Sequence, residues 1–420
     1  MDQLLITNVL LDGKITDVSI LNGKFAAIGE SICRSGFSRI IDANAKLAIL
    51  PGFYNTHCHA AMTLLRGYAD DMELFRWLNE CIWPAEAKLT EEDIYIGSRL
   101  AMLEMIKSGT VFFSDMYWHQ SGTIRAAEEM KIRCCLGLLF ICGPDGELLE
   151  RNLKNNQIVL EKSGSFPANI TLSCAPHAVY TVSKKVLQYV ADMAKDLQLP
   201  IHIHASETAR EVEDCKKQHG MTPIAYLDKI GILNEKTILA HCVHLEEDDC
   251  KIIAGRNSVI AHMPVSNMKL CSGAFDLQKA LAENCRVTLG TDGCSSNNNL
   301  SMLDEMKFAA LLAKHVSGDP ETGSAGKIFS IATSHGAEAF RLNAGVIAPG
   351  KDADAILVEL NHPAMVGDHN LIANMVYSAD PSVIHSVIVN GNLLMHDHHV
   401  PNEEEIISAA QDVCRRIRLS

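Results

Sequence analysis

The chain has 420 residues with 37 basic and 51 acidic side chains, so its formal net charge is −14. Such an acidic balance excludes a protein that binds nucleic-acid duplexes, because that affinity comes mainly from lysine and arginine on phosphates. With 47% hydrophobic and 21% charged residues, the composition is that of a folded globular protein rather than a disordered one.

No stretch of the sequence predicts a membrane span, since the longest nearly unbroken apolar run, 134–142, is far below the roughly 20 residues that cross a bilayer. The N-terminus begins Met1-Asp2-Gln3 without the basic region of a secretory signal. The 14 cysteines show no C-x-x-C spacing and fall in apolar stretches, as buried thiols do in a reducing compartment. We therefore expect a cytoplasmic protein with no membrane partner.

Two stretches at opposite ends of the chain share the pattern of small antiparallel strands. Residues 1–50 alternate short apolar runs with the turn signals Asp12-Gly13 and Asn22-Gly23, and residues 345–400 repeat this pattern with Asn390-Gly391. Neither stretch can bury a sheet face alone. We expect the two to form one small β-sandwich domain beside the rest of the chain.

Eight short apolar runs lie between residues 47 and 292, each separated from the next by enough chain for a helix. Their hydrophobicity is continuous rather than alternating, which is typical of parallel strands covered on both faces. They predict an α/β fold with a (β/α)8 TIM-type barrel over residues 51–344 and catalytic residues at the C-terminal strand ends. Residues 401–420, with glutamates first and arginines last, predict a closing helix. The eight runs are 47–53, 110–116, 133–140, 170–176, 200–205, 237–241, 258–263 and 286–291.

The end of the first run carries two histidines, His57 and His59, with Cys58 between them. Residues two apart on a strand face the same side, so both imidazoles are expected to point into the barrel mouth, where they suit a divalent metal ion. An isolated H-x-H can also be two unrelated loop histidines. The other strand ends decide between these two interpretations.

Further groups of the kind that bind metals stand where later runs end: His204 after the fifth, His241 after the sixth and Asp292 after the eighth. Charged groups at buried strand ends need partners, and a single metal ion supplies them. We expect Zn2+ in this site, with Fe2+ also compatible with nitrogen and oxygen ligands. The expected ligands are His57, His59, His204 and Asp292.

These strand ends resemble the amidohydrolase superfamily in its mononuclear branch, and the likeness extends over nearly the whole chain to the ending 350–354 (GKDAD). Binuclear members carry a carboxylated lysine after strand four, whereas 171–177 (TLSCAPH) contains no lysine, which favours one metal. Within the superfamily, 55–67 (NTHCHAAMTLLRG) and 290–297 (GTDGCSSN) resemble the deaminases of methylthioadenosine and S-adenosylhomocysteine. Shorter stretches that support this resemblance are 83–90, 175–183, 204–207, 240–245 and 264–270.

The resemblance implies hydrolytic deamination of the 6-amino group of an adenine nucleoside, with release of ammonia and the inosine-type product. A metal lowers the pKa of its bound water from roughly 15.7 to about 7, so hydroxide is available at neutral pH. Asp292 is placed to accept the proton of the water, and His241 to hydrogen-bond the nucleophile. Glu207 is the expected proton donor to the purine ring, although a glutamate there could instead cap the following helix.

The resemblance also implies residues that bind the substrate. Glu86 matches the family residue that holds the ribose hydroxyls, and His177 matches one that hydrogen-bonds the bound nucleoside. Trp83 could stack on a ring or on a 5′ substituent, but its helical spacing from Trp77 fits core packing equally well. Glu86 could likewise be a solvated acid at the start of a helix.

The remaining histidines are expected to act indirectly or not at all. His202 lies deeper on the same strand face as His204, where it either supports a metal ligand or packs in the core. His262 and Asn267 are expected to shape the seventh loop without taking part in chemistry. The histidines interpreted as surface or packing residues are His119, His244 and His335.

The sequence departs from these relatives after strand three, where those that grip the homocysteine carboxylate carry arginines. Here Leu138 stands where the first arginine is expected, and the region 148–151 aligns ambiguously. Without a fixed cation, a carboxylate tail loses its bidentate partner. We therefore expect neutral 5′ groups, as in methylthioadenosine, 5′-deoxyadenosine or adenosine, to be preferred over S-adenosylhomocysteine.

Two alternatives remain beside this interpretation. The same metal core could act on guanine, a pterin, cytosine or a chlorinated triazine. A barrel that has lost activity and serves as a scaffold is less consistent with the sequence, because an idle site has no physical reason to keep buried charges that need partners. The expected partner is a small nucleoside, and the sequence leaves a homo-oligomer open.

Overall fold

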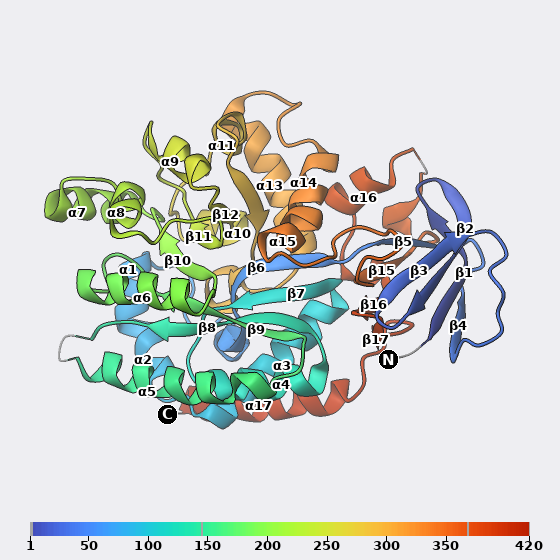
Figure 1. The fold of residues 1–420 in the computed structure, drawn as a ribbon, viewed down its shortest axis with the longest axis horizontal. Helices are drawn as coiled ribbons and strands as arrows, with labels where there is room; N and C mark the ends of the chain where they lie inside the picture. The colour runs from blue at the N-terminus through green and yellow to red at the C-terminus, as the bar shows by residue number, and fades with distance from the viewer. Residues whose placement is uncertain (1–2, 144–145, 368, 420) are drawn as a thin grey trace.

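A curled, nine-stranded parallel sheet forms the centre of the protein (Figure 1). The computed structural model describes residues 3–143, 146–367 and 369–419. Strand neighbours follow the chain order, and nearly every residue of these strands is buried, as their continuous hydrophobicity predicts. The strands are β6 (Phe53–His59), β7 (Thr110–Asp115), β8 (Arg133–Phe140), β9 (Ile170–Pro176), β10 (Ile201–Ala205), β11 (Thr237–His241), β12 (Val259–His262), β13 (Arg286–Leu289) and β14 (Asp292–Gly293).

The two ends of this sheet meet. β14 follows β13 after two residues and pairs in parallel with β6, with Asp292 opposite Cys58. The backbone N–H of Thr291 also donates to the carbonyl of His57 at 3.0 Å. The mixed α/β class is therefore confirmed, and the curled parallel sheet is consistent with the TIM-type barrel. The pairing brings the side chains after the last strand beside those of the first.

The first predicted run, 47–53, belongs to two different sheets. Residues Leu47–Pro51 form β5 of the small sheet, and the first strand of the central sheet begins only at Phe53. Gly52 makes the change of sheet sterically feasible, because a Cβ at this position would lie 2.2 Å from Cγ1 of Val111. The run is equally apolar on both sides of Gly52, so its hydrophobicity does not reveal the boundary.

Helices lie around the outside of the curled sheet, and short helices follow β6 (Figure 1). The segment after β6 contains η1 (Ala60–Leu65), α1 (Leu74–Trp77), the π-helix η2 (Leu78–Ile82) and α2 (Trp83–Glu86). The helices after it are α3 (Glu91–Lys107), α4 (Gln120–Met130), α5 (Glu147–Lys162), η3 (Ser163–Ser165), α6 (Lys184–Asp196), α7 (Ala209–His219), α8 (Pro223–Ile230), α9 (Asp249–Gly255), α10 (Pro264–Lys269), α11 (Leu277–Ala282), α12 (Cys294–Asn297), α13 (Met302–Ser317), α14 (Ala325–Ala332), α15 (Ser334–Ala339), η4 (Pro363–Met365), α16 (Leu371–Tyr377), η5 (Pro381–Val383) and α17 (Glu403–Leu419).

Strands from both ends of the chain build a second sheet, at the right of Figure 1. Its order is β17-β16-β15-β5-β1-β2-β3, with β4 parallel to β1, so the strands are hydrogen-bonded into one mixed sheet and the predicted sandwich layering is not confirmed. The three predicted turns are hairpins with positive φ at both turn residues, as type I′ turns require. The strands are β1 (Leu4–Leu11), β2 (Lys14–Leu21), β3 (Lys24–Gly29), β4 (Arg39–Asp42), β5 (Leu47–Pro51), β15 (Ala355–Glu359), β16 (Ile384–Val389) and β17 (Asn392–Met395).

The last helix, α17, packs along α3, where acidic and basic side chains pair (Figure 1). Arg99 of α3 lies 2.6 Å from Glu405, and Lys107 lies 2.7 Å from Glu403. No helix in the described part of the chain is long and apolar enough to cross a membrane. The cysteines are all unpaired thiols.

Candidate active site

Five of the predicted side chains converge at the C-terminal ends of their strands. His57 and His59 end β6, His204 and His241 come from β10 and β11, and Asp292 begins β14. The rings of His57 and His204 are 4.9 Å apart between centroids, and those of His204 and His241 are 5.4 Å apart. Oδ1 of Asp292 lies 3.5 Å from Nε2 of His57 and 3.2 Å from Nε2 of His59. The structure thus brings the expected ligands together.

Two of these residues adopt backbone conformations that side chains other than glycine rarely take. φ is +75° at His241 and +62° at Asp292. Such conformations cost free energy and cluster at functional sites. The strand ends are therefore shaped to aim these two side chains inward rather than to continue the sheet.

The four histidines are oriented by acceptors that bind their Nδ1 atoms. Nδ1 of His57 lies 2.8 Å from Nε2 of His202, and Nδ1 of His241 lies 2.8 Å from Oδ1 of Asn267. The other two donate Nδ1–H to backbone carbonyls, His59 to Met116 at 2.6 Å and His204 to His177 at 2.8 Å. Each ring therefore has Nε2 free for the cavity.

The charges of the site suit a cation. Burial lowers the pKa of His57 to about 4, which keeps this imidazole neutral and able to ligate. Although burial opposes ionisation, His57 and His59 hold the pKa of Asp292 well below its usual range. Burial also opposes the charge on His59, but Asp292 raises the pKa of that imidazole to about 9. A carboxylate is thus ionised at the centre of the site.

The residues present fit a divalent metal. Nε2 of His57 is buried and has no hydrogen-bond partner, which costs free energy unless a ligand occupies that atom. Ligand atoms of His57, His59 and Asp292 lie within 4.8 Å of one another, as do those of His57, His204 and His241. Three or four nitrogen and oxygen donors around one point are the usual environment of zinc.

Glu207 follows β10 and points its carboxylate into the same cavity. Its Oε2 lies 3.7 Å from Nε2 of His241, and its Oε1 accepts the hydroxyl of Ser272 at 3.4 Å. Burial raises its pKa above that of an ordinary glutamate. The alternative that Glu207 caps the next helix is not what the structure shows, because Thr208 is the N-cap of α7 and Glu211 accepts the neighbouring amides.

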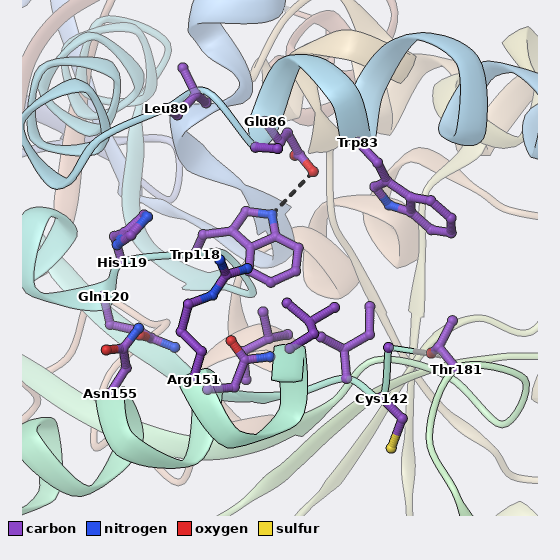
Figure 2. A pocket seen from close by; sticks show the side chains of 16 residues that line it. Trp83, Glu86, Leu89, Trp118, His119, Gln120, Cys142, Arg151, Asn155 and Thr181 are labelled. Carbon is purple, nitrogen blue, oxygen red and sulfur yellow. Dashed lines mark hydrogen bonds between the residues drawn. The ribbon is translucent and has the colours of Figure 1, made fainter. Parts of the chain in front are cut away.

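The other predicted binding residues surround two connected chambers. An inner chamber of about 70 Å³ is lined by His59, His204, His241 and Asp292 together with Glu207 and His177. Figure 2 shows an outer chamber of about 300 Å³. Trp83, Glu86 and Trp118 line both chambers.

Glu86 lies at the junction of these chambers. Its Oε2 accepts the indole N–H of Trp118 at 3.1 Å, while its Oε1 is buried without a partner. Burial raises the pKa of Glu86, whereas Tyr117 and Trp118 lower it. This carboxylate is therefore not the solvated helix-start acid of the alternative interpretation, and its second oxygen is available to a ligand.

His177 lies deep in the inner chamber. Its ring is 4.8 Å from that of His204, and Nδ1 contacts Oγ1 of Thr181 at 2.9 Å. Burial lowers its pKa to about 3, so the imidazole is neutral. Trp77, by contrast, is 4% exposed and donates its indole N–H to the carbonyl of Ala69 at 2.8 Å, although its ring also lines the inner chamber.

Several supporting residues were missed or undervalued by sequence reasoning. His202 bridges His57 to the hydroxyl of Ser114, so it supports one of the expected metal ligands rather than simply packing. Asn267 orients His241, although its amide alone gives no such signal in the sequence. The two serines that donate to Oδ2 of Asp292, at 2.6 and 2.9 Å, are Ser266 and Ser296.

Of the remaining histidines, one departs from its expected place. His119 lines the outer chamber instead of being only a surface or packing residue. His244 donates its Nε2–H to the carbonyl of Ser272, and His335 donates its Nδ1–H to the carbonyl of Val287, so both have packing roles. His262 is buried against the ring of Phe275.

Leu138 does not face the cavity. It is 0% exposed within the apolar core, and the neighbouring Leu139 and Ile141 line the chambers instead. Strand alternation explains this, because residues one apart point to opposite faces. The identity of residue 138 therefore does not decide which 5′ group fits.

Comparison with known proteins decides the family. The Amidohydrolase family matches residues 48–394, which is most of the chain. The chain belongs to the amidohydrolase family. Among solved structures, an adenosine deaminase from Xanthomonas campestris with bound zinc is 30% identical to this amidohydrolase, with a TM-score of 0.91 over 100% of this chain and 99% of that one. A triazine hydrolase variant, 22% identical with a TM-score of 0.90, shares the fold.

Curated relatives match this amidohydrolase over nearly its full length. A 5′-deoxyadenosine deaminase from Methanospirillum hungatei is 45% identical over 415 residues, covering 97% of this chain and 92% of the relative. A 5-methylthioadenosine/S-adenosylhomocysteine deaminase from Archaeoglobus fulgidus is 43% identical, covering 96% and 97%. The resemblance stated from the sequence motifs is thereby confirmed.

Proposed function

We propose that this amidohydrolase removes the 6-amino group of adenine nucleosides by hydrolysis, releasing ammonia and the inosine-type product. The observation that carries the proposal is the joint placement of the expected metal ligands, the buried acid Glu207 and the carboxylate of Glu86 around one pair of neighbouring chambers. Relatives of 40–45% identity that carry the names of nucleoside deaminases support this choice of substrate.

The proposed ligands of one divalent metal, Zn2+ by preference, are His57, His59, His204 and Asp292. When bound, such an ion supplies Lewis acidity that lets a water ionise near neutral pH. Asp292, whose Oδ2 is held by two serines, is positioned to accept the proton of the attacking water. His241 is assigned the hydrogen bond to the oxygen that develops charge, with Asn267 keeping its Nδ1 occupied.

Glu207 is assigned the proton transfer to the purine ring and then to the departing ammonia. A purine carbon becomes a good electrophile only when its neighbouring ring nitrogen gains a proton. Burial raises the pKa of Glu207, which favours the protonated form that this step needs. In the same proposal, Glu86 accepts ribose hydroxyls, His177 hydrogen-bonds the nucleoside, and Trp83 packs against its ring or its 5′ group.

The outer chamber is proposed to receive the 5′ substituent. Its wall from β8 and α5 is apolar at Leu139, Ile141 and Leu148, which suits a methyl, deoxy or methylthio group. Arg151 also lines it, and within the described residues this guanidinium has no carboxylate partner (Figure 2). The proposed preference for neutral 5′ groups therefore rests on this apolar wall and not on the identity of Leu138.

The test is a substrate panel with the metal-loaded protein, followed by ammonia release and ultraviolet absorbance. Methylthioadenosine, 5′-deoxyadenosine, adenosine and S-adenosylhomocysteine are expected to react, whereas guanine and a pterin are not. If only guanine or the pterin is turned over, the proposal of an adenine nucleoside substrate is wrong and that heterocycle is the substrate.

Removal of the metal with a chelator is expected to abolish turnover, and added Zn2+ to restore it. A metal-free preparation with full activity would contradict the proposed centre.

The proposed preference for neutral 5′ groups is tested separately. Arg151→Met is expected to lower kcat/KM for S-adenosylhomocysteine while leaving methylthioadenosine within about 3-fold, because an unpaired carboxylate tail loses a charged hydrogen bond. Wild-type kcat/KM is expected to be higher for methylthioadenosine. The reverse order would show that the chamber selects the charged tail.

Two further parts of the proposal concern the division of the chain into domains and the location of the protein in the cell. We assign residues 51–344 to a closed (β/α)8 barrel, residues 1–50 and 345–400 to the small β-domain, and residues 401–420 to the terminal helix. A cytoplasmic location fits the unpaired thiols, which persist in reducing compartments.

A further inference from the structure

Outside the cavity, the carboxyl group of Glu211 on α7 accepts hydrogen bonds from the backbone of the turn that carries Glu207. Its Oε1 accepts the backbone N–H of Ser206 at 3.0 Å, and its Oε2 accepts that of Glu207 at 2.7 Å. The carboxylate is buried, with 3% of the residue exposed. Each oxygen of one side chain therefore holds one amide of the turn, which fixes the turn in two places.

This contact is a displaced form of a common helix cap. In a capping box, the third helical residue accepts the amide of the N-cap residue itself. Here Thr208 is the N-cap and its hydroxyl accepts the amide of Glu211 at 3.1 Å, but the returning carboxylate bonds the two residues before the cap. As a result, the side chain of Glu207 is not needed at the helix end and is free to enter the cavity.

The turn needs such a restraint. Ser206 has a φ of +52°, a conformation that costs free energy for a side chain other than glycine. The acceptor Glu211 binds the amide of this strained residue. Beyond the turn, the carboxylate of Glu207 has only distant contacts, 3.4 Å to Ser272 and 3.7 Å to His241. The backbone of Glu207 is thus held more tightly than its carboxyl group, so the orientation of the carboxyl group depends on the backbone.

We propose that Glu211 is a positioning residue for proton transfer by Glu207. Glu211 is not among the residues that line the two chambers. It acts by fixing the backbone from which the carboxyl group of Glu207 projects. This inference rests on the proposed function, since it takes Glu207 as the proton donor.

The variant that tests it is Glu211→Gln, which keeps the size of the side chain. A glutamine can accept one of the two amides, but its NH2 group then faces the other N–H, so one contact is lost. We expect kcat for an adenine nucleoside to fall by about 10- to 100-fold, because small misplacements of a reacting group have effects of this size. KM is expected to stay within about 3-fold.

A substrate with a different leaving group separates positioning from general damage. Chloride departs from a 6-chloropurine riboside without accepting a proton, whereas ammonia must be protonated to leave. Glu207→Gln and Glu211→Gln are therefore both expected to lower the ratio of 6-amino to 6-chloro turnover. A merely structural defect lowers both reactions alike and leaves the ratio unchanged.

Asp249→Asn is the matched control. Asp249 is also a buried carboxylate at a helix start, 2% exposed, and it accepts the amide of Glu246 at 2.9 Å and the hydroxyl of Thr222 at 2.6 Å. Neither it nor its partners line the chambers. Its substitution is expected to lower stability without changing the ratio of the two turnovers.

If Glu211→Gln does not fold, as judged by its thermal transition, Glu211→Asp takes its place, because aspartate keeps the carboxyl group but is too short to reach both amides. An unchanged ratio in the folded variant would overturn the role of Glu211. Wild-type protein that releases no ammonia from any adenine nucleoside would instead overturn the proposed function, before any variant is compared.

Discussion

At the level of single residues, the four cavity histidines each use Nδ1 for a hydrogen bond within the protein, so the rings are oriented before any ligand binds. Two of the acceptors are backbone carbonyls, of Met116 and His177, one is an amide and one is another histidine. A pre-oriented Nε2 avoids the cost of ordering a side chain when a metal or substrate arrives.

Glu86 leads to a prediction at this scale. Its Oε1 is buried, unpartnered and at the junction of the chambers, where it can accept ribose hydroxyls. Glu86→Gln replaces one acceptor by a donor, and KM for nucleosides is expected to rise about 10- to 100-fold, the usual loss for a hydrogen bond to a charged group.

The inhibition constant of free adenine, which has no ribose, is expected to change by less than about 3-fold. Steady-state kinetics with both ligands check this prediction, and Glu91→Gln on the exposed face of α3 is the control. Equal losses for nucleoside and base would remove the role of Glu86 in ribose binding.

At the scale of secondary-structure elements, the sequence predicts positions on strands better than the supports behind them. The H-x-H spacing and the histidines and aspartate at later strand ends sufficed to predict that these side chains converge, because alternation and the barrel topology determine where they meet. Ser266 and Asn267 gave no comparable signal, since their partners come from strands or loops far away in the chain. For His202, strand alternation left a supporting role and a packing role open.

The boundary between β5 and β6 shows the same limit within one apolar run. Hydrophobicity reports burial but not which sheet buries the residue, so 47–53 looked like a single strand. The short helices of 60–86, including the π-helix, were also outside what periodicity predicts, because a single turn is too short to show a period. Glu86 was found only through family resemblance.

The docking of α17 gives a prediction about pH. Asp93 of α3 forms a capping box with Thr90 and an ion pair with Arg416 of α17. Burial alone would raise the pKa of Asp93, but these partners hold it below its ordinary value. A carboxylate with a lowered folded-state pKa stabilises the fold above its unfolded pKa of about 3.9, and this contribution is lost as the pH falls through that range.

Asp93→Asn is therefore expected to lower the free energy of unfolding by about 1 kcal/mol at pH 7, limited by solvent screening because Arg416 is half exposed. The difference from wild type is expected to persist down to about pH 4 and to shrink below it, as measured by urea unfolding. Glu92→Gln, on the same helix as Asp93, serves as the control, because it breaks an exposed pair with Arg125 of α4. A difference that grows on acidification would contradict the assigned role.

At the scale of the whole molecule, a buried ionic network joins the two sheets. Arg133, at the start of β8, lies 3.2 Å from Asp352 and 3.4 Å from Asp354, both just before β15. Asp354 is 0% exposed and also accepts the hydroxyl of Tyr54 at 2.8 Å and the amide of Asn390 at 2.7 Å. The network thus connects the first and third strands of the curled sheet to the small sheet.

Arg133→Met is expected to destabilise the protein by about 3 kcal/mol, because it leaves Asp354 buried without its cation. Adding Asp354→Asn is expected to recover part of this loss, since no uncompensated charge then remains. At a temperature where both variants are folded, kcat is expected to match wild type, because Arg133 begins its strand and the cavity lies at the opposite strand ends. Urea unfolding and nucleoside turnover, measured on the same preparations with Arg341→Met at an exposed ion pair as control, separate these effects. A large fall in kcat of folded Arg133→Met would contradict this prediction, because it would show that the ionic network between the two sheets affects catalysis in the cavity.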